Sequence, residues 1–171
     1  MMPILRTVMF VSLFTSMLTG GAGVAVAKDC TFNDLHGEFT VTADCEGLQD
    51  FSGIGQPLKR MWLAGSWGQL EIIEVPSPYQ AADLDLVMET LARFWSNWRT
   101  PGPLSSMQLA GMEARVVTER KPRTTSRTWL FNLGGRNITA RAVAYGKRSE
   151  REQNLEKIAE AFVKSFKHKA E

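Results

Sequence analysis

Residues 112–166 contain four patterned segments in a row: MEARVVTERK (112–121), SRTWLFNL (126–133), RNITARAVAY (136–145) and SEREQNLEKIAEAFVKSF (149–166). Apolar residues alternate along the first three segments, which predicts strands with one apolar face. Gly134 and Gly135 predict a hairpin turn, because glycine adopts positive φ without strain. The last segment repeats apolar residues at helical spacing, and Ser149 with Glu152 predicts a capping box at its start.

The preceding part of the chain predicts further strands and one more helix. Residues 37–44, 58–64, 69–75 and 105–110 read as strands, whereas 28–36 and 47–57 read as irregular. Residues 81–98 predict a helix with one apolar stripe, made of Leu84, Met88, Leu91, Trp95 and Trp98. The chain is therefore expected to be an α+β protein: an α/β/α sandwich whose central antiparallel sheet of about six to seven strands is flanked by two main helices.

The first 27 residues have the pattern of a cleaved signal peptide. Arg6 precedes an apolar run, and Ala25-Val26-Ala27 matches the A-x-A site of signal peptidase. We expect one domain at residues 28–171, exported to the periplasm, with no stable membrane insertion after cleavage. Retention of the leader as a membrane anchor is the alternative.

Two cysteines, Cys30 and Cys45, follow the leader. An even pair in an exported protein predicts one structural disulfide. The spacing is not C-x-x-C, and the chain has two histidines, His36 and His168. This composition offers no clustered ligands of the kind that metal sites use, so no metal site and no cofactor are expected.

The charges are unevenly distributed, although the formal net charge is only +2. Residues 28–100 contain eleven acids and five bases, and residues 113–151 contain ten bases and three acids. Such polarity can steer a partner, pair the two halves internally, or simply cover solvated edges. Nucleic acid is not expected as a partner, because no basic motif interleaved with aromatic residues is present.

The sequence carries no catalytic signature. Nucleophilic catalysis needs a nucleophile held against a base, and His36 and His168 lie in polar terminal contexts. Glu71 and Glu74, three residues apart on one predicted strand, are the remaining candidates for a pair of catalytic carboxylates. We therefore expect the protein not to be an enzyme.

The order of elements resembles the PsbP/Mog1-like family, including the DcrB-like bacterial exported proteins. The resemblance rests on GEFTVTA (37–43), the proline-terminated strand before a long helix, GMEARVV (111–117), and the end of the last helix, AFVKSF (161–166). It implies an α/β/α sandwich and a role as an accessory or small binding protein without a shared active site. The pair Cys30 and Cys45 is a departure from the family pattern.

These observations predict a non-catalytic periplasmic accessory protein that binds another envelope or secreted protein, with an immunity-type inhibitor as a sharper version. Trp67, in a predicted turn, either folds back on the sheet or awaits a partner. The candidate binding residues are Trp67, Arg120, Arg123 and Arg127. The alternative is a small-molecule or lipid carrier, with a cavity between the first helix, at Met88 and Trp95, and the sheet.

Overall fold

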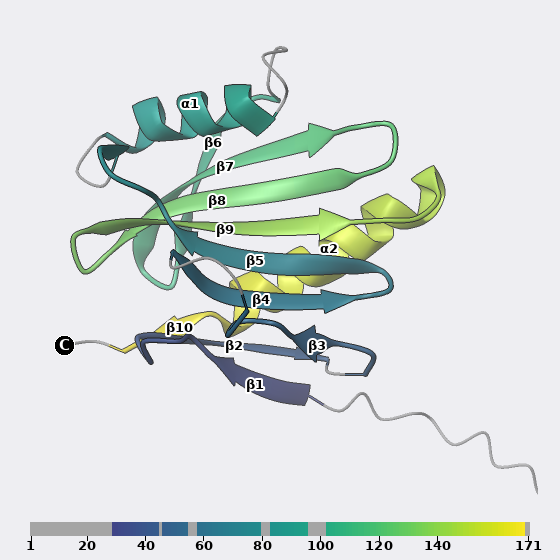
Figure 1. The fold of residues 1–171 in the computed structure, drawn as a ribbon. Helices are drawn as coiled ribbons and strands as arrows, with labels where there is room; N and C mark the ends of the chain where they lie inside the picture. The colour runs from purple at the N-terminus through teal and green to yellow at the C-terminus, as the bar shows by residue number, and fades with distance from the viewer. Residues whose placement is uncertain (1–28, 45, 55–57, 80–82, 96–101, 170–171) are drawn as a thin grey trace, which may run out of the picture.

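A computed structural model describes residues 29–44, 46–54, 58–79, 83–95 and 102–169, without the side chain of Trp95 (Figure 1). The elements follow in the order β1 (Asp29–Asn33), β2 (Phe39–Asp44), β3 (Gln49–Asp50), β4 (Lys59–Gly65), β5 (Gly68–Glu74), α1 (Leu84–Trp95), β6 (Ser105–Leu109), β7 (Met112–Arg120), β8 (Thr125–Leu133), β9 (Arg136–Ala144), α2 (Arg148–Ser165) and β10 (Lys167–His168).

The strands form two antiparallel sheets. The larger sheet has seven strands in the order β3-β4-β5-β9-β8-β7-β6, and the smaller has three in the order β1-β2-β10. The predicted central sheet is confirmed. Residues 28–36 and 47–57 were predicted to be irregular, which is wrong for Asp29–Asn33 and Gln49–Asp50, because each pairs with a neighbouring strand despite its polar composition.

The two helices cover opposite faces of the larger sheet, as the predicted sandwich requires. In Figure 1, α2 runs behind β9, β5 and β4, and α1 lies above β7. Leu155, Ile158 and Phe162 of α2 belong to the main core cluster, with Trp129 and Phe131 of β8. A smaller cluster lies under α1 and consists of Val75, Val87, Met88, Ala92, Val117 and Leu130.

Small residues let α2 approach the sheet closely. Ala140, Ala142 and Ala144 of β9 are fully buried in the main core. A Cβ atom at Gly68 would lie 2.4 Å from the carbonyl oxygen of Val143 and 2.8 Å from Cδ1 of Ile158. Helix α2 therefore packs on a face of small residues, and Gly68 extends that face to β5.

The helix starts differ from the predicted ones. Asp83 precedes α1 and accepts a hydrogen bond from the backbone N–H of Asp85 (2.8 Å), which caps the helix. The predicted capping box of Ser149 and Glu152 is wrong, because α2 already begins at Arg148. Its N-cap is Lys147, which makes no side-chain capping bond. Glu152 instead faces a strand, as described below.

Three predictions concern residues outside the described ranges. The two ends of the helix predicted over 81–98, with Trp98 on its apolar stripe, lie in residues that the structure does not describe. The leader and its cleavage site lie within residues 1–28, so the single domain at 28–171 stays a prediction. The predicted disulfide involves Cys45, which also lies outside the described residues. Cys30 lies on β1 opposite Ala43 of β2, two residues before position 45. The pairing of Cys30 with Cys45 therefore stays a prediction.

Candidate functional site

Three chain connections meet at one end of the larger sheet, on the right in Figure 1. They are the β4–β5 turn (66–67), the β7–β8 turn (121–124) and the β9–α2 connection (145–147). The strand register brings them together, because Gly68 and Thr125 both lie opposite Ala144. The backbone N–H of Tyr145 also donates a hydrogen bond to the carbonyl of Trp67 (3.1 Å). We call this region the turn end.

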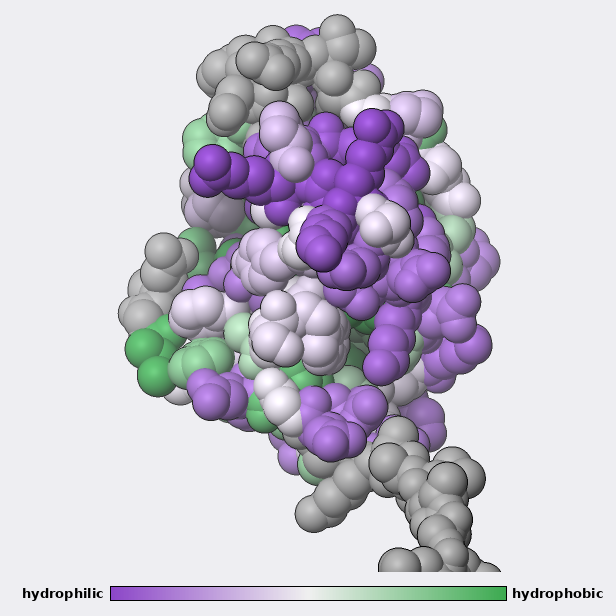
Figure 2. All heavy atoms as spheres, turned by 90° about the vertical axis from the view of Figure 1, so that its right-hand side faces the viewer, coloured by the Kyte–Doolittle hydropathy of each residue, from purple (hydrophilic) through white to green (hydrophobic). Residues whose placement is uncertain are grey.

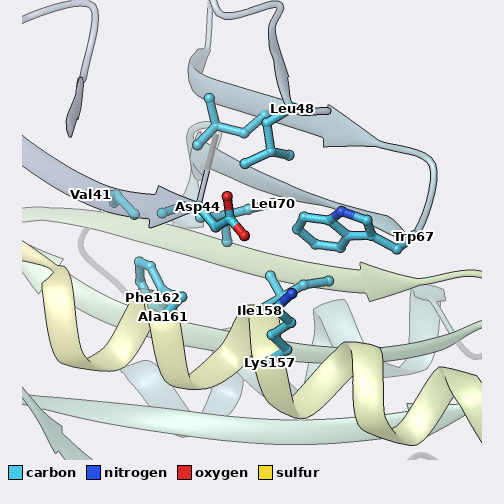
Figure 3. Close-up of a pocket in the computed structure, with 11 residues that line it drawn as sticks. Val41, Asp44, Leu48, Trp67, Leu70, Lys157, Ile158, Ala161 and Phe162 are labelled. Atoms are coloured by element: carbon cyan, nitrogen blue, oxygen red, sulfur yellow. The ribbon is translucent and has the colours of Figure 1, made fainter. Parts of the chain in front are cut away.

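An apolar crevice opens beside the β4–β5 turn (Figure 3). The indole of Trp67 forms one wall, Leu48 lies above it, and Ile158 and Lys157 of α2 lie below. The crevice has a volume of about 50 Å³. Its remaining lining is also mostly aliphatic, with Asp44 and Lys157 as the charged members: Val41, Ala43, Asp44, Leu63, Leu70, Lys157, Ala161 and Phe162. A volume of this size accepts no more than one aliphatic side chain of a partner.

The structure decides between the two sequence-based hypotheses for the Trp67 side chain. Trp67 is partly buried and packs against the main core, so it folds back on the sheet. One side of its ring nevertheless lines the open crevice. Trp67 therefore contributes to the core and also presents an aromatic surface to solvent, which is the combination found in interface anchors.

Basic side chains gather at the turn end, next to the crevice. Arg120, Lys121 and Arg123 lie at the β7–β8 turn, and Lys147 and Arg148 at the start of α2. Figure 2 looks onto this end and shows hydrophilic residues over its upper part, at the height of these two segments, with a paler and greener surface below. Buried Arg151 ties the two segments together by donating a hydrogen bond to the Lys121 carbonyl (2.9 Å).

Two of the three predicted binding arginines are engaged by acids of α2. Nε of Arg120 lies 3.0 Å from Glu152, and Arg127 donates to both carboxylate oxygens of Glu156 at 2.9 and 2.6 Å. The Arg127 hydrogen bonds lower the pKa of Glu156. Arg123 is exposed and forms no ion pair with any residue that the structure describes. Of the predicted arginines, Arg123 is therefore the one most available to a partner.

A buried, incompletely bonded ion pair lies on the α1 face of the sheet at this end. Glu119 is 5% exposed, and its two carboxylate oxygens accept no hydrogen bond within the described part of the chain. The nearest base is Arg141, with Nη2 at 3.7 Å. Burial raises the pKa of Glu119 and lowers that of Arg141. The pKa of nearby Tyr145 is also raised, because part of its side chain is desolvated.

The opposite end of the sheet carries a larger buried ion network around Arg60, which is 1% exposed. Its Nε and Nη2 atoms donate to Oδ1 of Asp34 at 2.9 and 2.8 Å. Nη2 also contacts Glu38 at 2.9 Å, and Nη1 contacts Glu74 at 3.3 Å. Arg136 binds Glu38 from β9 at 2.5 Å. We call this region the network end.

Hydrogen bonds satisfy the carboxylates of the network end. Oδ2 of Asp34 accepts the backbone N–H groups of Glu38 (2.6 Å) and Phe39 (3.2 Å). The hydrogen bonds from Arg136 and Arg60 lower the pKa of Glu38 to about 2. These groups link the β1–β2 loop to β4, β5 and β9. The network therefore holds the smaller sheet against the larger one.

The catalytic candidates do not converge. Glu71 faces the α1 side and pairs with Lys59 at 2.9 Å, whereas Glu74 faces the α2 side and pairs with Arg60. The two carboxylates are therefore on opposite faces of β5 and cannot share a substrate. Within the described ranges, no cluster of three His, Cys, Asp or Glu residues could hold a metal ion, and no helix is long and apolar enough to cross a membrane.

Sequence reasoning missed several residues of the turn end. It did not place Lys147 and Arg148 beside Arg123, and it did not find the crevice lined by Leu48 and Ile158. The missing information was the register that aligns the ends of β5, β8 and β9. Successive antiparallel hairpins predict that alternate turns share an end of the sheet, so that signal was present in the order of the predicted strands.

Comparison of the whole fold with solved structures places it in a known class. The solution structure of cyanobacterial PsbP (CyanoP) from Synechocystis sp. PCC 6803 matches with a TM-score of 0.60 at 13% identity, covering 89% of this chain and 99% of that one. A crystal structure from Bacteroides thetaiotaomicron VPI-5482 matches with a TM-score of 0.50 at 10% identity. The match covers 85% of this chain and half of the Bacteroides chain.

The protein therefore has a PsbP-like fold, as the resemblance in the sequence implied. At these identities the comparison shows the fold alone, and the Mog1-like part of the resemblance stays a prediction. No protein-family model matches the sequence, and no curated protein matches it.

Proposed function

We propose that this protein is a non-catalytic accessory protein of the cell envelope that binds another protein through the turn end. The observation that carries the proposal is the convergence of the Trp67 crevice and the exposed basic residues on one end of the sheet. A partly buried aromatic residue beside an apolar crevice, with charged residues around it, is the usual composition of a binding hot spot. The PsbP-like fold supports an accessory role by analogy.

The positions of the buried residues argue for binding at the surface and against an internal ligand. The predicted carrier cavity lay between α1 and the sheet, near Met88 and Trp95. Val87 and Met88 are fully buried there against Val75, Val117 and Leu130, so their side chains fill that space. The 50 Å³ crevice is too small for a small molecule, because such sites need roughly 300 Å³, and the two larger recesses, of about 500 and 390 Å³, are open to solvent and lie away from α1. An immunity-type inhibitor is a narrower form of the same proposal.

The test is site-specific photo-crosslinking in cells that produce the protein. A photoreactive phenylalanine analogue at Ser66, which is exposed next to Trp67, should give one discrete crosslinked protein. The same group at exposed Glu89 on α1 is the position control. The crosslinked protein is identified by mass spectrometry, purified, and titrated against this protein by calorimetry.

Alanine substitutions then distinguish a loss of binding at the crevice from a general loss of stability. Trp67→Ala should weaken the purified complex at least tenfold, and Trp62→Ala should leave it unchanged. Trp62 is the matched control, because it is also partly buried on β4–β5 but stacks on Phe51 away from the crevice (5.1 Å between ring centroids). Thermal unfolding checks that both variants fold. Crosslinking at Glu89 and not at Ser66, or equal affinities of the two variants, would overturn the proposal.

A further inference from the structure

We infer that the partner of the turn end is an acidic protein segment that places one aliphatic side chain in the Trp67 crevice and its carboxylates against the basic residues beside it. This inference rests on the proposed function and specifies the chemistry of the partner. It depends on the charge of the turn end, on the size of the crevice, and on the distance between the basic residues and the crevice.

The charge of the turn end is positive because part of it is not balanced within the fold. The end of β7, the β7–β8 turn and the first turn of α2 carry five bases, Arg120, Lys121, Arg123, Lys147 and Arg148, against the three acids Glu119, Glu150 and Glu152. Glu152 forms an ion pair with Arg120. Arg127 is paired with Glu156, and Arg136 is paired with Glu38 and Glu74. Exposed Arg123, Lys147 and Arg148 leave this end with a positive charge, which attracts an acidic partner over about one Debye length.

The helix α2 sets the spacing between the two parts of the site. Arg148 begins α2, and Lys157, nine residues later, lines the crevice. At 1.5 Å per residue and 3.6 residues per turn, these positions are about 14 Å apart along the helix axis and on opposite faces of it. An extended chain advances about 3.3 Å per residue, so at least four residues are needed to span this distance. The segment should therefore carry its carboxylates at least four residues from its aliphatic anchor.

The orientation of Trp67 favours a protein over an anionic membrane surface. Residues that anchor a protein in a bilayer interface project outward into the lipid headgroups. Trp67 instead lies folded against the core and faces Ile158 across a recess (Figure 3). A recess of this kind accepts a protruding side chain, and a flat lipid surface does not enter it.

The test uses fluorescein-labelled peptides and fluorescence anisotropy with the purified protein. The probe peptide has one leucine followed, four residues later, by three glutamates. One control peptide has serine in place of leucine, and another has lysine in place of the glutamates. The probe should bind at least tenfold more tightly than either control, and raising NaCl from about 50 to 300 mM should weaken it severalfold.

Matched charge reversals locate the binding surface. Arg123→Glu with Arg148→Glu should weaken probe binding at least tenfold. Lys164→Glu with Lys167→Glu changes the net charge equally at exposed positions outside the turn end and should have little effect. Equal binding of the acidic and basic peptides, or equal loss in both double variants, would overturn the inference.

Two other partners of the turn end, a membrane surface and a second copy of this chain, would give different results. If the protein bound phosphatidylglycerol vesicles and not the peptide, its partner would be an anionic membrane and not an acidic protein segment. Salt-sensitive self-association in sedimentation experiments, abolished by Arg123→Glu with Arg148→Glu, would mean that the partner is a second copy of this chain. If the protein crosslinked at Ser66 binds with no dependence on salt or on these reversals, the proposed function stands and the acidic partner is wrong.

Discussion

Arg60 and Glu119 are both buried charged residues at opposite ends of the sheet, but they differ in how many partners surround them. At the network end, Arg60 contacts three carboxylates, and Asp34 accepts further backbone hydrogen bonds. At the turn end, Glu119 accepts no hydrogen bond from the described residues and has its nearest base at 3.7 Å. Accordingly, the pKa of Glu38 is lowered at one end and that of Glu119 is raised at the other.

The two carboxylates differ in both burial and hydrogen-bond donors: Glu38 is partly exposed and receives arginine hydrogen bonds, whereas Glu119 is buried without hydrogen-bond donors. This difference separates the structural end of the sheet from the candidate binding end. The network end uses its charges to join the two sheets. The turn end leaves basic side chains exposed and a carboxylate poorly satisfied, which is typical of a region whose residues serve something other than stability.

The largest effect is expected from Arg60→Met. This substitution leaves Asp34 buried without its cationic partner, and breaking such a buried pair costs about 3–5 kcal/mol of unfolding free energy. Urea denaturation at neutral pH measures the loss. Arg120→Met is the matched control at the turn end, since its exposed pair with Glu152 contributes less than about 1 kcal/mol. Similar losses in both variants would show that the network is not the stabilising element.

A smaller effect of opposite sign is expected from Glu119→Gln. Ionised Glu119 is buried without hydrogen bonds, so the neutral amide should raise the unfolding free energy by about 1 kcal/mol at pH 7. Because burial raises the pKa of Glu119, the unfolded carboxyl ionises first as pH rises, and wild-type stability falls relative to the variant. The gain should therefore vanish below about pH 4.5, where both states are protonated. Chemical denaturation at pH 7 and pH 4 tests this, and a destabilised variant at pH 7 would contradict it.

The sequence predicted the architecture because it depends on local periodicity. Alternation along Trp129, Phe131 and Leu133 and the glycines at 134 and 135 determined the β8–β9 hairpin, whose register is observed residue by residue. The α2 stripe at Leu155, Ile158 and Phe162 is likewise confirmed as core. Helix boundaries were less predictable, because Gly146, with φ of 106°, lets the chain turn into α2 at Arg148.

The charge networks could not be predicted from sequence, because their members are far apart in the chain. Asp34 lies in a segment that was interpreted as irregular, and its partner Arg60 is 26 residues away on β4. Arg136 reaches Glu38 across 98 residues. The excess of acids in the first half and of bases in the second indicated that such pairs could form. Only the fold specifies that Arg136 is neutralised while Arg123 is left exposed.

The smallest effect on unfolding free energy is expected from Glu38→Gln, and its pH dependence tests the difference between the two ends of the sheet. Arginine hydrogen bonds lower the pKa of Glu38 from 4.5 to about 2, so its ionised form stabilises the folded state. That contribution is complete above about pH 4.5 and is lost as pH falls towards 2. Since 36% of the side chain is exposed, Glu38→Gln should cost less than about 1 kcal/mol at pH 7.

The pH profiles of the two glutamine variants should therefore differ in sign. The stability difference between wild type and Glu38→Gln should favour wild type at pH 7 and shrink between pH 4.5 and about 2. For Glu119→Gln the difference should favour the variant at pH 7 and disappear at acid pH. Parallel urea titrations of the three proteins from pH 2 to 7 measure both. If both stability differences had the same sign at pH 7, the two clusters would respond to burial alone. The proposed difference between the donor-rich network end and the donor-poor turn end would then be wrong.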